Sequence, residues 1–146
     1  MKTTKPLIAF LLLFTLTSCV FTSTYTNREA DKQEAEKVTN RFFELIKAKN
    51  YEAAYPLFSD DFLSVTPKPK LKEMFVTIQD KLGDLTSTSL DQWQTKVVKG
   101  TDPSSEYDLL YQNQHAKFKS AEEFKLTKNW DGKIRILYYH VTSPGF

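Results

Sequence analysis

The stretch EEFKLTKNWDGKIRILYYHV, residues 122–141, decides the fold. In its first half Phe124, Leu126 and Trp130 alternate with polar residues, which predicts a strand with one face in the core. Asp131-Gly132 follows and is a two-residue hairpin signal, because both residues tolerate the positive φ of a type I′ turn. The second half is apolar in both registers, so its outer side is either covered or exposed. The registers are Ile134, Ile136 and Tyr138 on one side and Leu137, Tyr139 and Val141 on the other.

The chain upstream of this hairpin continues the same pattern of Thr, Val, Tyr and Phe from about Leu85 onward, which is typical of strands. Turn residues divide it at Gly100-Thr101-Asp102-Pro103 and near Lys119-Ser120. Short connections between consecutive strands favour an antiparallel meander. We predict strands over residues 86–99, 105–118, 121–130 and 133–142.

The residues before this β-rich half show helical periodicity. A long helix is predicted over residues 28–49, capped by Thr26 or Asn27, because apolar residues recur there at i, i+4, i+7 and i+8. One or two short helices follow Asn50, since Pro56 suits the first turn of a helix and not its interior. The apolar positions of the long helix are Val38, Phe42, Leu45 and Ile46.

A third helix is predicted over residues 69–82, ending at Gly83, where a positive φ closes many helices. Its apolar face consists of Leu71, Phe75, Ile78 and Leu82. The expected fold class is therefore α+β, with N-terminal helices packed on a curved four-stranded antiparallel sheet.

The N-terminus carries a targeting pattern. Lys2 and Lys5 precede an apolar run over residues 7–16, which is too short to cross a bilayer permanently. The run ends in Leu16-Thr17-Ser18-Cys19, which resembles the lipobox of bacterial lipoproteins. This resemblance implies a signal peptide over residues 1–18, acylation of Cys19, a tether over residues 19–27 and a single domain over residues 28–146. Cys19 is the only cysteine, so no disulfide can form within the chain.

The same resemblance implies an address in the cell envelope. Val20, not aspartate, follows Cys19, which favours the outer membrane over retention in the inner membrane. The chain has 20 Lys and Arg against 18 Asp and Glu, and Lys2 and Lys5 leave with the signal peptide, so 18 of each remain. A neutral mature protein has no electrostatic footprint for nucleic acid.

The domain also resembles small bacterial members of the nuclear-transport-factor-2-like, or cystatin-like, superfamily. The resemblance covers residues 30–142 and rests on the element order, on the segment Lys49-Asn50-Tyr51-Glu52-Ala53-Ala54-Tyr55 and on Asp131-Gly132-Lys133-Ile134. It implies a cone in which a curved sheet wraps helices. The superfamily includes ketosteroid isomerase and dehydratases as well as non-catalytic binding domains, and no catalytic Asp, His or Tyr of those enzymes aligns with this chain. Fold alone therefore assigns no activity.

Few residues suggest chemistry. His115 and His140 are the only histidines and lack metal-ligand spacing, so neither a metal nor another cofactor is expected. A proton-transfer pair of His140 with Asp91 or Asp108 is the catalytic alternative. The pair Asp60-Asp61 precedes Phe62 and is interpreted as a helix cap.

The aromatic residues of the sheet half are the remaining guide to function. Most are expected in the core, while Trp93, Tyr111 and His140 are candidates to line a ligand pocket in the cone. Leu137, Tyr139 and Val141 are candidates for an apolar dimer face. The sequence thus favours a lipid-anchored, non-enzymatic binding or accessory domain for an envelope protein or a small apolar ligand. An isomerase-like or dehydratase-like enzyme and a structural homodimer are the alternatives.

Overall fold

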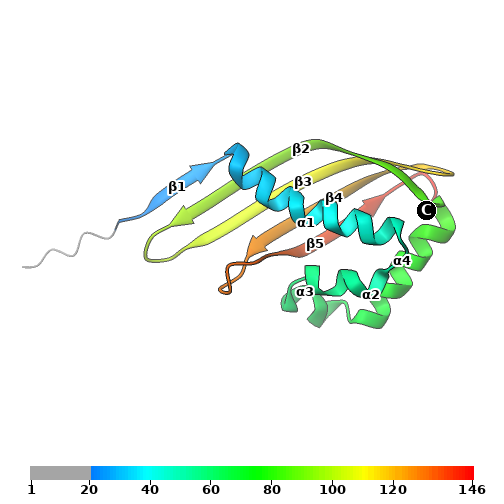
Figure 1. Ribbon diagram of the computed structural model, residues 1–146, viewed down its shortest axis with the longest axis horizontal. Coiled ribbons are helices and arrows are strands. Elements are labelled where there is room, and N and C mark those ends of the chain that lie inside the picture. Colours follow the sequence, from blue (N-terminus) through cyan, green and yellow to red (C-terminus); the bar gives the residue numbers. More distant parts are fainter. Residues whose placement is uncertain (1–20) are drawn as a thin grey trace, which may run out of the picture.

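The computed structural model describes residues 21–146, and Cys19 with the predicted signal peptide lies outside this range (Figure 1). The helices are α1 (Glu29–Lys47), α2 (Tyr51–Ala54), the single 3₁₀ turn η1 (Tyr55–Leu57), α3 (Asp60–Val65) and α4 (Lys68–Leu82). The strands are β1 (Ser23–Thr26), β2 (Leu85–Lys99), β3 (Ser104–His115), β4 (Lys119–Lys128) and β5 (Ile134–Thr142).

The strands form one antiparallel sheet in the order β1-β2-β3-β4-β5. The predicted four-stranded sheet is therefore wrong, although the α+β class holds. The fifth strand, β1, lies in the segment that the sequence assigned to the tether, and Ser23 pairs with Lys99 while Thr26 pairs with Lys96. Four residues are too few to show periodicity, but Thr and Tyr favour extended backbone. The Tyr25 ring also packs under the Arg28 guanidinium, 3.9 Å from the ring centroid.

Asn27 joins β1 to α1 and does not cap the helix as predicted. It has a positive φ of 51°, and the N-terminal flanking residue of α1 is Arg28. The Asn27 side-chain oxygen accepts a hydrogen bond from the Thr95 N–H, and its own N–H donates to the Thr95 carbonyl, both at 2.9 Å. Asn27 therefore ties the start of α1 to β2 at Thr95, four residues before the end of that strand.

The other helix boundaries lie within two residues of the predictions. Pro56 lies in the first turn of η1, as its lack of an N–H requires. The cap of α3 is Ser59, whose hydroxyl accepts a hydrogen bond from the Phe62 N–H at 3.1 Å. Asp60 and Asp61 occupy the first turn instead, where negative charge suits the helix dipole.

The core lies between one sheet face and the helices, and aromatic rings dominate it. Phe42 on α1 is fully buried and stands at the centre, with five ring centroids between 5.1 and 6.0 Å from its own. Edge-to-face pairs of this kind each add about 0.5–1.5 kcal/mol beyond simple burial. The five surrounding rings are Phe43, Phe58, Phe75, Phe124 and Tyr139.

The turn between β4 and β5 differs from the predicted type I′ turn. Only Gly132 has positive φ, at 78°, and the Gly132 N–H donates to the Asn129 carbonyl. The loop is longer than two residues, so Trp130 lies at its tip and is 99 % exposed, not in the core as predicted.

A bulge at Leu137 changes the faces of β5. Lys125 pairs with Tyr138 whereas Leu126 pairs with Ile136, so Leu137 is an extra residue on β5. Tyr139 consequently packs against Phe42 in the core, while Leu137 borders a hollow on the outer face. The three residues of the predicted dimer face therefore do not share one side of the sheet.

Candidate functional site

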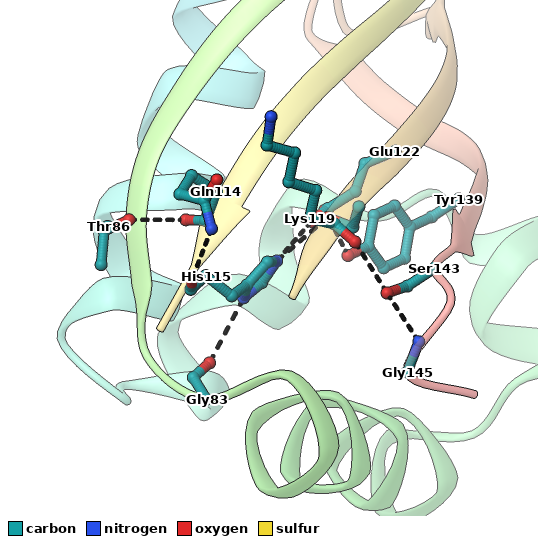
Figure 2. Close-up of polar contacts among 10 residues, drawn as sticks. Gly83, Thr86, Gln114, His115, Lys119, Glu122, Tyr139, Ser143 and Gly145 are labelled. Atoms are coloured by element: carbon teal, nitrogen blue, oxygen red, sulfur yellow. Dashed lines mark hydrogen bonds and ion pairs between the residues drawn. The ribbon is translucent and has the colours of Figure 1, made fainter. Parts of the chain in front are cut away.

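A buried polar network occupies the inner face of the sheet near the C-terminal ends of β3 and β5 (Figure 2). Its centre is Glu122 on β4, which is 2 % exposed. The Tyr139 hydroxyl donates to Glu122 Oε2 at 2.7 Å, and the Ser120 hydroxyl donates to Oε1 at 3.0 Å. We call Glu122, Tyr139, Ser120 and His115 the Glu122 network.

His115 is the fourth member and is 3 % exposed. Its Nε2 lies 3.0 Å from Ser120 Oγ and 3.4 Å from Glu122 Oε1. Its Nδ1 lies 3.3 Å from the carbonyl oxygen of Gly83, in the turn after α4. Both ring nitrogens of His115 thus face oxygen atoms.

The Tyr139 hydroxyl acts as a hydrogen-bond donor to Glu122. Burial, together with the neighbouring Glu122 carboxylate, raises the pKa of the Tyr139 phenol well above its ordinary value. The hydroxyl therefore keeps its proton and stabilises the buried carboxylate. A buried carboxylate without such donors would cost several kcal/mol.

The space beside the network is small. The adjoining cavity measures about 10 Å³ and is lined on its apolar side by Ile46, Phe75 and Ile78. This volume approaches the minimum for a single water and excludes an organic substrate. In this conformation the Glu122 network therefore joins β3, β4, β5 and the turn after α4 as a structural clamp.

Of the three pocket candidates from the sequence, Trp93 and Tyr111 lie on the neighbouring strands β2 and β3, whereas His140 lies on β5. Tyr111 is buried in the core, where its hydroxyl lies 2.6 Å from Thr39 Oγ1 and burial raises its pKa to about 12. Trp93 is partly buried, with Lys32 5.5 Å from its ring centroid. His140 is exposed and stacks on Tyr138.

The proposed proton-transfer pairs of His140 do not form. Asp108 instead accepts a hydrogen bond from Lys125 at 3.1 Å. Asp91 accepts one from Gln112, at 3.3 Å. The buried histidine–carboxylate contact of this protein involves the other histidine, His115, and Glu122, which the sequence reasoning missed.

A groove of about 390 Å³ runs between α4 and β5. We call it the α4–β5 groove. Tyr139 links it to the Glu122 network, because its ring lines the groove and its hydroxyl reaches Glu122. The apolar lining residues are Met74, Ile78, Tyr139, Val141 and Phe146, and the polar ones are Lys70, Glu73, Thr77 and His140.

A comparison with protein-family models and a search of curated proteins found no match to this chain. The lipoprotein and nuclear-transport-factor-2-like assignments therefore stay predictions from the sequence. Within residues 21–146, no three His, Cys, Asp or Glu side chains gather to hold a metal ion. No helix in that part of the chain combines the length and apolar character that a membrane span needs.

Proposed function

We propose that this protein is a lipid-anchored domain of the bacterial cell envelope that binds an extended segment of a partner protein and catalyses no reaction. The observation that carries the binding role is the α4–β5 groove, which lies along the open edge of the sheet. The anchor is carried by Leu16-Thr17-Ser18-Cys19 behind its apolar run. The cavity of about 10 Å³ beside the Glu122 network favours binding over catalysis.

The edge of β5 supports an extended ligand. β5 has a sheet neighbour on one side only, β4. At Ile136 the other edge of β5 pairs with a short extended segment of this chain. Phe58 forms a parallel bridge with Ile136, and the Ser59 N–H donates to the Ile136 carbonyl at 2.9 Å. Tyr139, His140 and Val141 continue along the groove. A partner strand would gain main-chain hydrogen bonds from β5 and side-chain contacts from α4.

The anchor is tested by replacing the acylated residue. Cys19→Ala is expected to abolish labelling by a palmitate analogue and to release the protein from bacterial membranes, because acyl chains supply the binding energy. Ser23→Ala, four residues later, is the control and should remain labelled. Labelling of the Cys19→Ala protein would contradict the anchor.

The groove is tested by photocrosslinking in intact bacteria. A photoreactive residue at Thr77, which is exposed in the groove, is expected to give one defined adduct, whereas the same residue at Lys72 on the same helix should give none. Val141→Lys should abolish the Thr77 adduct by placing a charge in the apolar lining. Thr142→Lys, at the next residue of β5, is the matched control.

The mass of the adduct separates the alternatives. A partner polypeptide supports the proposal, provided that Val141→Lys removes it. An adduct with a second copy of this chain would replace the proposal by a homodimer. An adduct that forms equally at Thr77 and Lys72, or survives Val141→Lys, would exclude the groove as the binding site.

A further inference from the structure

Two exposed aromatic side chains mark one end of the molecule. Trp130 is 99 % exposed at the tip of the turn between β4 and β5, and Phe21 is 79 % exposed before β1. They are the two most exposed large apolar residues within residues 21–146. Single exposed apolar residues are common, but a fully exposed tryptophan loses most of the burial that a large ring offers.

The strand register places both residues at the same end of the sheet. Ser23 of β1 pairs with Lys99 at the end of β2, and Lys128 at the end of β4 pairs with Ile134 at the start of β5. A Cβ on Gly100 would overlap the Phe21 carbonyl, so Phe21 lies against the β2–β3 turn. Figure 1 shows the start of β1 and both turns at one end, with the C-terminus at the other. Three strand spacings, about 14 Å, separate β1 from β4.

The predicted anchor belongs to this end. Cys19 precedes Phe21 by two residues and Ser23 by four, and four extended residues span at most about 14 Å. Acyl chains on Cys19 would therefore hold this end of the sheet within the same distance of the bilayer. That distance suffices to bring Trp130 to the membrane interface.

The chemistry of this end fits a lipid surface. Tryptophan is enriched at membrane interfaces because its ring is apolar and its N–H remains hydrated. Lys128 pairs with Glu34 and Arg135 pairs with Asp131 at this end, whereas Lys99 and Lys133 take part in no ion pair within residues 21–146. The insertion itself rests on the aromatic rings, so a neutral bilayer should suffice.

We propose that Trp130 and Phe21 insert into the interface of the bilayer that holds Cys19. The inference rests on the lipid anchor proposed above. This insertion would hold the sheet end-on to the membrane, with β5 running from the bilayer toward the aqueous phase. The α4–β5 groove, about five to seven residues farther along β5, then lies roughly 20 Å from the lipid and faces the compartment where a partner protein is available.

Tryptophan fluorescence of the mature lipidated protein in phosphatidylcholine vesicles tests the insertion. Trp93→Phe leaves Trp130 as the only tryptophan, and its emission is expected to shift to shorter wavelength and to be quenched by brominated lipid. Trp130→Phe leaves the partly buried Trp93 as the control, and its emission should not respond to brominated lipid. In the unaltered protein labelled with fluorotryptophan, a lipid-borne spin label should broaden one of two ¹⁹F resonances.

The outcomes separate the two proposals. Intact mass of the membrane-extracted protein reports acylation of Cys19. An unmodified Cys19 overturns the anchor and, with it, the insertion. An acylated, vesicle-bound protein whose Trp130 stays accessible to an aqueous quencher and insensitive to brominated lipid overturns the insertion alone.

Discussion

Glu122 has surroundings that leave little freedom for substitution. Its carboxylate is 2 % exposed and receives hydrogen bonds from the hydroxyls of Tyr139 and Ser120. Removing a carboxylate from such a site leaves its donors buried without an acceptor, which costs more than the bonds themselves contribute. Truncating one member of the Glu122 network should therefore lower the stability of the protein more than removing a surface ion pair would.

Glu122→Ala is therefore expected to lower the free energy of unfolding by about 2–5 kcal/mol, because the buried Tyr139 and Ser120 hydroxyls lose their acceptor and each unsatisfied group costs about 1–3 kcal/mol. Urea unfolding followed by circular dichroism measures the change. The adjacent Glu123→Ala is the control and should stay within about 0.5 kcal/mol of the unaltered protein, because its side chain is on the exposed outer face. Equal stability of the two variants would show that the network contributes little.

The strand β1 and the turn that follows it were not predicted from the sequence. The strand has four residues, and Asn27 ends it with positive φ and two hydrogen bonds to Thr95. Asparagine tolerates this backbone region better than most residues, and its side chain supplies the acceptor that the Thr95 N–H needs. Asn27 thus fixes the position of α1 on the sheet.

Asn27→Ala should lower the free energy of unfolding by about 1–3 kcal/mol, because it strains the left-handed backbone and removes the acceptor for the Thr95 N–H. Asn27→Asp keeps both the acceptor and the tolerance for positive φ, so its unfolding temperature should be close to that of the unaltered protein. Thermal unfolding of the three proteins compares them. The idea fails if Asn27→Asp is as destabilised as Asn27→Ala.

The faces of β5 were predicted wrongly because we assumed that its side chains alternate without interruption. One extra residue at Leu137 moves Tyr139 and Val141 to the side of the helices, where they line the α4–β5 groove. Because successive side chains of a strand point to opposite faces, a one-residue bulge reverses every position after it. The apolar residues in both registers were the visible sign of this change.

At the scale of the whole molecule, long periodic segments were predictable and short or irregular ones were not. The sequence predicts α1, α4 and β2–β5 because each extends over several turns or pleats. It misses β1, which is too short, and the exposed Trp130, which belongs to a loop longer than two residues. The sequence did contain a sign of the Glu122 network. Glu122 lies two residues before Phe124 on β4, so both side chains face the core.

The proposed end-on placement makes a further prediction for the whole molecule. In the lipidated protein the Cys19 thiol is blocked by the acyl group, so a cysteine introduced at Thr77 or Trp130 is the only free thiol. On vesicles Thr77→Cys should react with a membrane-impermeant maleimide as fast as the same substitution does in solution in a soluble, acyl-free protein that begins at Val20. Trp130→Cys should react more slowly on vesicles, and equal rates at both positions in both states would contradict the placement.

The position of β1 has a mechanical consequence. If the chain is held through Cys19, a force between the membrane and a bound partner enters the domain through β1, because this strand is the first element of residues 21–146. Pulling along the strand loads its hydrogen bonds to β2 together and in parallel. Asn27, which follows β1 and is hydrogen-bonded to Thr95 of β2, would share the load before it reaches α1. With Cys19 acylated and a partner in the α4–β5 groove, as proposed above, the four-residue strand would be the mechanical link between them.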